Sequence, residues 1–428
     1  MKLSVAQQGA GTLQWFIYIL VTSIALPITL GEVFQLSLVE VAGLIQRTLF
    51  IVGVSSLLHA LLTRSTPLVY GPAGSWAGIF VILAALSVQQ GQSPQDALPA
   101  LAGGMALSGL LLIILGIFGW IGKIARLFTP LVTGSFLLIL SFQLSAVFLA
   151  GMVTDPQTEQ FDLATAVIAF SVFIFVVCCS VKKQGLLRNY GVLVGILLGW
   201  LFFSFFVTTR GDVLPSQAWF ALPQLFSWGL PELNIGMVLV SSLFTFTLVS
   251  NIIAANRAVC QAQMDSDELR PVLLKQSSIA GGISHLLASV FSAIGVVPLP
   301  MTAGFLQLTG LRQMLPFILA CIALSLFALI PPIIGLLAQV PAAVANAVLM
   351  ASFIKLVGLA LQAMSSQGLT QRDTGILGIT LLFSMAIMML PTHLFDTLPV
   401  SARYVFGNPL LMGTLICMLL ERVWPKEA

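Results

Sequence analysis

Long apolar runs recur from one end of this chain to the other, and they restrict it to one kind of fold. Hydrophobic residues make up 58% of the sequence and charged residues 8%, whereas about a quarter of a soluble globular protein is charged. Strands of a membrane β-barrel alternate apolar and polar residues, but these runs are continuous. The sequence therefore predicts an all-α polytopic membrane protein.

A helical span needs about 20 apolar residues, and fewer where the helix is broken. The first run lacks a cleavage pattern and is read as a retained span rather than a signal peptide. An even number of spans puts both chain ends on one side of the membrane. We predict fourteen spans, at residues 13–30, 39–62, 68–87, 99–121, 128–150, 162–181, 189–208, 234–256, 274–292, 297–309, 313–335, 340–359, 374–391 and 406–423.

The distribution of charge supports this count, because Lys and Arg collect in cytoplasmic loops. With the N-terminus inside, the outer loops contain only Arg210 and Arg403 of the 18 basic residues, and two more, Arg47 and Lys355, lie within spans. We therefore expect a multi-pass protein of the cell (inner) membrane with both termini cytoplasmic. The net charge of +3 gives no indication of nucleic-acid binding. Acidic residues gather on the outer side: Glu32, Glu40, Asp96, Asp155, Glu159, Asp162, Asp212, Glu232 and Asp396.

Two apolar segments, residues 66–86 and 293–310, are interrupted by Gly and Pro and are poor continuous helices. Backbone that is broken at membrane depth must be buried by protein or line a polar cavity. Paired broken segments in matching positions of two halves indicate the midplane site of a transporter. We therefore place the candidate binding site at these two segments.

The Pro-containing outer segment 209–233 divides the chain into two sets of seven spans. Broken span three corresponds to broken span ten, and span five, which begins at Pro130, corresponds to span twelve, which begins beside Pro341. An odd number of spans per half inverts the second copy, so we predict a 7+7 inverted repeat and alternating access.

Spans one and eight supply further polar groups, namely Gln14, Trp15, Thr247, Ser250 and Asn251. Such groups offer donors and acceptors to a neutral heterocycle. Each Ser or Thr has the alternative role of an interhelical hydrogen bond, whereas Asn251 favours a site because a full amide is costlier to bury.

Charged residues and histidines within the spans can have either a functional or a structural role. Arg47 is either functional or held by a partner carbonyl or Gln46, and Lys355 is expected to extend to the interface. His285 either titrates or is a hydrogen-bonded structural residue.

No Asp or Glu lies at the depth of the broken segments, so ion coupling has no visible carboxylate. The five cysteines lack metal-ligand spacing, and no enzyme motif, metal site or organic cofactor is indicated.

The segment Met301-Thr302-Ala303-Gly304-Phe305-Leu306-Gln307-Leu308-Thr309-Gly310 resembles the signature of the nucleobase–ascorbate transporter family of uracil, xanthine and purine permeases. That signature is Gln, Glu or Pro, then Asn, any residue, Gly, four residues, Thr, and Arg, Lys or Gly. Gly304, Thr309 and Gly310 match, and the first two positions do not. The resemblance implies that the residue at the first position binds the base, so Met301 lacks the polar side chain that is expected to make that contact.

The resemblance extends to other positions. Gln14-Trp15 is similar to the Gln-His pair in span one of the family, with the His replaced. Ser75-Trp76-Ala77 resembles its Ser-Phe-Ala in span three, which implies that Trp76 packs on the base. The Glu of its span eight falls at Ser250 or Asn251.

The resemblance covers essentially the whole chain and implies short antiparallel strands in broken spans three and ten, with the substrate between them. It also implies a bacterial protein and a homodimer formed through gate helices. The implied domains are a core, 1–125 (spans 1–4) and 234–336 (spans 8–11), a gate, 126–210 (spans 5–7) and 337–428 (spans 12–14), and an outer connecting loop, 211–233.

Together these features predict a secondary active transporter for a nucleobase, a purine or related heterocycle. Trp15 and Trp76 would supply apolar and stacking contact, and backbone N–H groups near Thr302 to Gly304 would donate to a ring carbonyl. Two alternatives remain open. One is an anion or other small-metabolite carrier of the same fold, and the other is a non-transporting membrane receptor or assembly protein.

Overall fold

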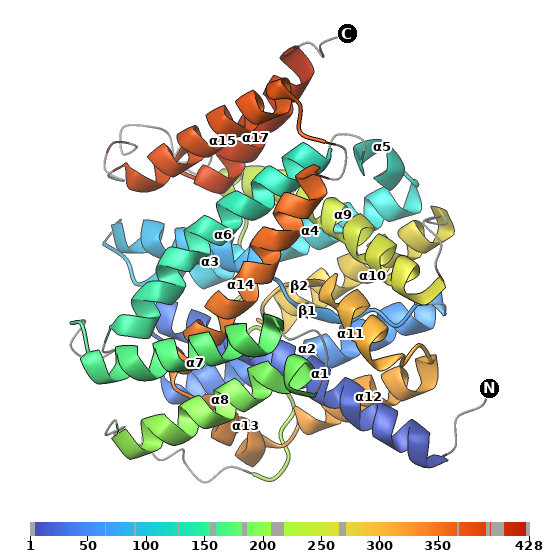
Figure 1. Cartoon of the computed structure of the whole chain (residues 1–428), viewed down its shortest axis with the longest axis vertical. Helices are drawn as coiled ribbons and strands as arrows, with labels where there is room; N and C mark the ends of the chain where they lie inside the picture. The colour runs from blue at the N-terminus through green and yellow to red at the C-terminus, as the bar shows by residue number, and fades with distance from the viewer. Residues whose placement is uncertain are drawn as a thin grey trace.

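The computed structural model describes residues 5–64, 66–89, 91–125, 129–154, 160–181, 186–206, 218–264, 271–365, 368–390, 394 and 406–424. Its helices surround one small two-stranded sheet near the centre of the molecule (Figure 1). The helices and strands are α1 (Val5–Val33), α2 (Leu38–Thr63), β1 (Tyr70–Pro72), α3 (Gly74–Gln89), the 3-10 helix η1 (Pro94–Ala97), α4 (Leu98–Ile117), α5 (Ile121–Ala125), α6 (Pro130–Val153), α7 (Leu163–Val181), α8 (Leu186–Phe206), α9 (Ile235–Met264), α10 (Pro271–Val290), β2 (Val296–Pro298), α11 (Met301–Thr309), α12 (Met314–Phe327), α13 (Pro331–Ala338), α14 (Ala342–Ser365), α15 (Gln371–Met389) and α17 (Pro409–Val423).

Eight helices of the described residues are long and apolar enough to cross a membrane, and the bent pair α12–α13 would make nine. The prediction of a polytopic helical membrane protein is therefore confirmed. The count of fourteen spans and their inverted repeat stay predictions.

The span predicted at 313–335 stays a prediction, and its two helices, α12 and α13, do not form one straight helix. The chain bends by 87° between α12 and α13. The cause is local: Pro331 and Pro332 cannot donate a backbone hydrogen bond, and a proline also disfavours helical backbone at the residue before it. Ile330, which precedes them, has φ −108° and ψ 87°, outside the helical region.

Helices from the two halves of the chain pack against each other. The most extensive helix contacts join α4 to α10 and α6 to α14. Glycines permit the first pair to approach closely, because a Cβ atom on Gly109 would lie 2.7 Å from the carbonyl oxygen of Gly282, and one on Gly282 would lie 2.5 Å from that of Gly109. Small residues at such crossings allow close van der Waals packing, which stabilises helix pairs in lipid.

Buried apolar side chains form one large core around the central sheet and a smaller one beneath α15 and α17. These two helices lie side by side at one end of the molecule (Figure 1). Arg372 of α15 is buried and donates to the carbonyl oxygens of Glu421 and Trp424, at 2.6 and 2.9 Å. It thereby satisfies carbonyls that the C-terminal end of α17 leaves without helical partners.

Candidate functional site

The two interrupted segments meet in the centre of the molecule. Strands β1 and β2 pair antiparallel, with Tyr70 opposite Pro298 and Pro72 opposite Val296. Helices α3 and α11 begin just after their strands, so both start inside the protein (Figure 1). The prediction of short antiparallel strands in broken spans three and ten is confirmed.

Side chains satisfy the open edges of this ribbon. The Ser56 hydroxyl accepts a hydrogen bond from the Tyr70 N–H at 2.9 Å, and Thr302 Oγ1 accepts from the Val69 N–H at 3.4 Å. Both hydroxyls are fully buried. Protein side chains therefore supply hydrogen-bond partners for backbone groups of the broken segment, as is required at membrane depth.

The first turn of α11 uses its own backbone donors. The Thr302 N–H donates to the Leu299 carbonyl and the Ala303 N–H to the Pro300 carbonyl, both at 3.0 Å. These N–H groups were expected to donate to a bound ring carbonyl, but in this structure they are engaged within the chain. The tight turn at the start of α11 uses these N–H groups in hydrogen bonds to carbonyls three residues earlier.

Trp76 lies in the first turn of α3 with no exposed surface. Its indole N–H donates to Nε2 of His285 on α10 at 2.9 Å, and its ring packs edge-on against Phe244 of α9, with centroids 4.6 Å apart. Trp76 therefore joins α3 to α9 and α10. Ser75, its neighbour, is also buried.

Trp15 of α1 belongs to an aromatic cluster around α11. Its ring centroid lies 4.5 Å from that of Phe305 and 4.9 Å from that of Phe317. Tyr18, also on α1, stacks on the same Phe305 ring, with centroids 4.4 Å apart. The Trp15 indole nitrogen is buried and has no hydrogen-bond partner among the described residues. The Tyr18 hydroxyl faces Thr302 without the geometry of a hydrogen bond. Gln14, next to Trp15, is half-buried.

Helix α9 packs against β2 and α11 and carries the three polar candidates of span eight. Thr247 is buried, and Ser250 and Asn251 are half-buried. The side-chain oxygen of Asn251 is buried without a hydrogen-bond partner in the described part of the chain. Because an unpaired buried acceptor is costly, Asn251 is suited to receive a hydrogen bond from a bound molecule.

The signature residues divide into two groups. Thr309 and Gly310 end α11: the Thr309 hydroxyl donates to the Phe305 carbonyl at 2.8 Å, and Gly310 adopts the left-handed conformation at φ 67°. Met301 and Gly304 face open space instead. Met301 is 39% exposed, and a Cβ atom on Gly304 would meet nothing within 4 Å.

The structure brings Trp15 and helix α9 against the short helix α11, which carries Thr302 and Gly304, and places Trp76 against Phe244 of α9 and His285 of α10. Sequence reasoning missed Tyr18 and Phe305 as neighbours of the site and His285 as the partner of Trp76. The only sequence signal for His285 was its position within a span. Among the described residues, no group of His, Cys, Asp or Glu could hold a metal ion.

Protein groups hold the polar side chains of Gln46, Arg47 and His285. The Arg47 Nε donates to the Ser292 carbonyl at 3.0 Å, so a partner carbonyl holds it, while Gln46 donates to Ala221. His285 is hydrogen-bonded at both ring nitrogens, as a structural histidine would be. The side chain of Lys355 and all of His393 lie outside the described residues.

Comparison with known proteins agrees with this architecture. A family model described as "Permease family" matches residues 6–393. The chain is 29% identical to "Putative purine permease YwdJ" of Bacillus subtilis (strain 168) over 97% of this chain and 96% of that protein. It is 22% identical to the "Xanthine permease" of the same strain, over 94% of this chain and 90% of that protein.

Solved structures show the same fold at low sequence identity. The transmembrane domain of the cyanobacterial bicarbonate transporter BicA aligns with a TM-score of 0.64 at 14% identity, covering 97% of each chain. The murine anion transporter Slc26a9, in an inward-facing state, aligns with a TM-score of 0.64 at 12% identity, covering 99% of this chain and 68% of that one.

Proposed function

Because this multi-pass membrane protein belongs to the Permease family, a family of transporters, we propose that it moves a nucleobase, a purine or related heterocycle, across the cytoplasmic membrane by alternating access. The observation that carries the proposal is the central ribbon, at which α3 and α11 both begin. Related proteins are named as purine, xanthine and uric acid permeases, which supports a nucleobase as the substrate class.

In this proposal the base lies against α11 and α9. Met301 and Gly304 leave room for it, Asn251 and Thr302 supply polar groups, and the Trp15 cluster supplies apolar surface. A neutral heterocycle fits these groups, because β1, α3, β2 and α11 contain no charged residue. Gln14, Thr247 and Ser250 complete the proposed lining.

Trp76 has a different role in this proposal from direct stacking. Its N–H is engaged by His285, and its ring packs on Phe244. It would hold the start of α3, which directly follows β1, in place, so that the ribbon keeps its position while substrate binds. Ser75, its neighbour in the first turn of α3, would be held in place together with Trp76.

Transport would involve movement of the core (1–125 and 234–336) against the gate (126–210 and 337–428), linked by the loop 211–233. We also propose that both termini are cytoplasmic in a bacterial inner membrane, and that gate helices form a homodimer. The described elements β1, α3, β2 and α11 contain no carboxylate that would support proton coupling. An uptake rate indifferent to a proton ionophore would exclude such coupling.

An anion carrier is the second candidate, since the fold is shared with a bicarbonate transporter and an anion transporter. An anion would be stabilised by a cation near the starts of α3 and α11, and these helices contain none. Competition decides between the two: excess bicarbonate or chloride would reduce uptake of labelled base only if the site also binds anions.

The test is uptake of radiolabelled xanthine, hypoxanthine and uracil by proteoliposomes containing the full chain. We expect uptake of at least one base by the parent chain and a loss of at least ten-fold in Gly304→Leu, because the added side chain would fill the space beside α11. Since nothing lies within 4 Å of a Cβ atom built on Gly304, this variant should have the same unfolding temperature as the parent chain.

Gly358→Leu is the matched control. Gly358 lies on α14, is exposed, and also has nothing within 4 Å of a built Cβ atom. Uptake by this variant should equal that of the parent. Absence of uptake of every base by the parent chain would reject the proposed function, and equal loss in both variants would reject the proposed site.

A further inference from the structure

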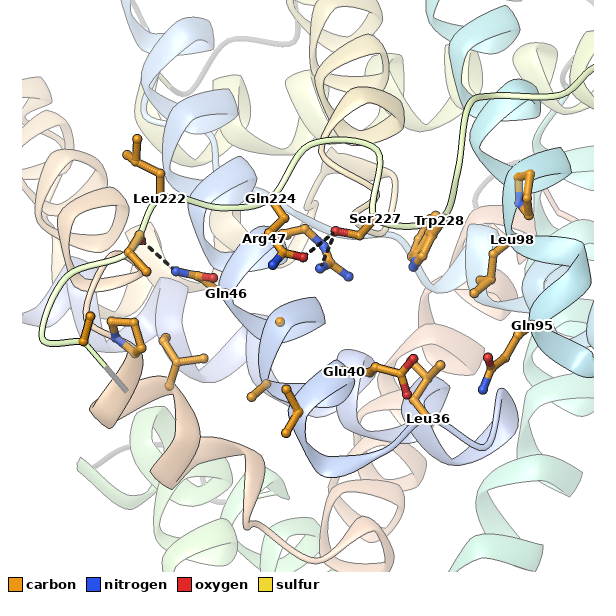
Figure 2. Close-up of a pocket in the computed structure, with 18 of the residues that line it drawn as sticks. Leu36, Glu40, Gln46, Arg47, Gln95, Leu98, Leu222, Gln224, Ser227 and Trp228 are labelled. Carbon is orange, nitrogen blue, oxygen red and sulfur yellow. Dashed lines mark hydrogen bonds between the residues drawn. The ribbon is translucent and has the colours of Figure 1, made fainter. Parts of the chain in front are cut away.

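A pocket distinct from the central ribbon opens among α2, the start of α4, α13 and the segment 218–232, with a volume of about 850 Å³ (Figure 2). Its apolar walls include Leu36, Leu98 and Ile334. By the charge distribution, this is the face predicted to be outside the cell. None of the proposed central-site residues lines it.

Arg47 forms one wall of this pocket and is only 6% exposed. Its Nε donates to the Ser292 carbonyl and its Nη1 to the Ser227 hydroxyl, both at 3.0 Å. Within the described part of the chain, no carboxylate lies within 4.0 Å of its nitrogens. A guanidinium has five N–H donors, so Arg47 retains donors for a ligand. A buried cation without an ion pair is costly unless its surroundings compensate it.

The opposite wall carries acceptors. Glu40 faces Arg47 across the open space (Figure 2). Asp96 and Glu232 are also among the lining residues. Glu40 is held in place by hydrogen bonds from the N–H and hydroxyl of Ser37, at 2.8 and 2.7 Å. Arg47 and Glu40 therefore offer a donor and an acceptor on facing parts of the pocket that do not form an ion pair with each other.

Trp228 adds a second donor to the pocket. It is 8% exposed, and its ring packs edge-on against Phe80 with centroids 5.8 Å apart. Its backbone N–H is bonded to Ser292, whereas the indole nitrogen is directed to the pocket (Figure 2).

We propose that this pocket is an outer binding site for an uncharged oxo-heterocycle, which occupies it before reaching the central site. A lactam edge carries a carbonyl and an N–H side by side: the carbonyl would accept from Arg47 and Trp228, and the N–H would donate to Glu40. The flat faces would lie against the apolar walls. A simple anion would meet three carboxylates, and a simple cation would meet Arg47, so both are disfavoured. The ligand class rests on the proposed function.

The test is protection of a thiol at the rim. Leu222 lines the pocket and is 71% exposed, whereas Leu230, in the same segment, is 72% exposed and lies outside the lining. Leu222→Cys and Leu230→Cys are each made with Cys178→Ser, which removes the exposed native thiol. The purified full chain is labelled with a polar maleimide with and without saturating xanthine or uracil.

We expect the base to slow labelling of the Leu222→Cys thiol at least five-fold and to leave the Leu230→Cys thiol unaffected. Arg47→Gln should abolish the protection. Trp228→Phe, which keeps a ring but removes the N–H, should weaken it and covers the case in which Arg47→Gln does not fold. Gly304→Leu should preserve the protection, because it blocks only the central site.

Equal labelling rates with and without base would overturn the proposal, as would protection that survives Arg47→Gln or disappears in Gly304→Leu. Uptake by the same preparation separates this result from the proposed function. If the protein takes up base but the base does not slow labelling of the Leu222→Cys thiol, the outer site is rejected and the proposed function stands.

Discussion

His285 shows how one buried residue determines the geometry of another. The Trp76 indole can only donate, so Nε2 of His285 must accept, and its proton resides on Nδ1, which donates to the Gly281 carbonyl at 2.8 Å. A neutral imidazole is therefore fully satisfied between two elements, α3 and α10. His285 is a positioning residue for the start of α3.

Replacing His285 by Leu should lower the free energy of unfolding by about 1–3 kcal/mol, because it leaves the Trp76 N–H buried without a partner. Trp76→Phe removes that N–H, so the double variant should lose less than the sum of the single losses, with a coupling of about 1 kcal/mol. Denaturant unfolding of all four proteins in detergent measures the cycle. Additive losses would show that the hydrogen bond contributes nothing.

At the scale of elements, the ends of helices follow from local chemistry. Asp162 precedes α7, and its carboxylate accepts from the Thr165 N–H at 2.8 Å and the Ala164 N–H at 3.4 Å. Hydrogen bonds from the side chain and backbone of Thr165 hold the Asp162 pKa below its ordinary value. The ionised carboxylate is thus the form that caps the helix.

Asp162→Ala should destabilise the protein by about 1 kcal/mol at neutral pH, the usual cost of losing a cap. A depressed folded pKa contributes stability above the unfolded pKa of about 3.9, and this contribution is lost as pH falls through the folded value. The difference from the parent should therefore shrink in acid, as thermal unfolding at several pH values will show. Asp162→Asn retains a capping side chain and should remain close to the parent near neutrality.

At the scale of the molecule, α1 and α14 are joined by buried polar contacts where the predicted core meets the predicted gate. The Thr29 hydroxyl donates to the Asn346 side-chain oxygen at 2.8 Å, and the Asn346 amide donates to Glu32 at 2.9 Å. Thr29 and Asn346 are almost fully buried. These bonds stabilise the arrangement seen here and must change if the two domains move.

Asn346→Ala should change the maximal uptake rate several-fold with little change in KM, because it alters the balance between facing states without touching the proposed site. Glu32→Gln keeps an acceptor for Asn346 and should resemble the parent. Ser352→Ala, also on α14, removes only a bond within the helix to Val348 and is the matched control. A variant that is less stable but transports at the parental rate would assign these bonds to folding alone.

The sequence alone predicted the membrane environment, the helical class and the two broken segments. These depend on composition and on local backbone chemistry, which Gly, Pro and long apolar runs express directly. The same local chemistry is present at Pro331-Pro332, but the length of the apolar run 313–335 suits a single span, and the bend between α12 and α13 was not predicted. Thr309 and Gly310 were recognised as a motif, and the span predicted at 297–309 ends at the same residue as α11.

Only the tertiary structure decided which residues meet. Ser56 pairs with Tyr70, Trp76 with His285, and Arg47 with Ser292, and the last two pairs are more than 200 residues apart in the chain. Apolar periodicity cannot predict such contacts, because every face of a helix inside a bundle is apolar. The direction of each polar side chain depends on which neighbouring helix has an unpaired group to offer it.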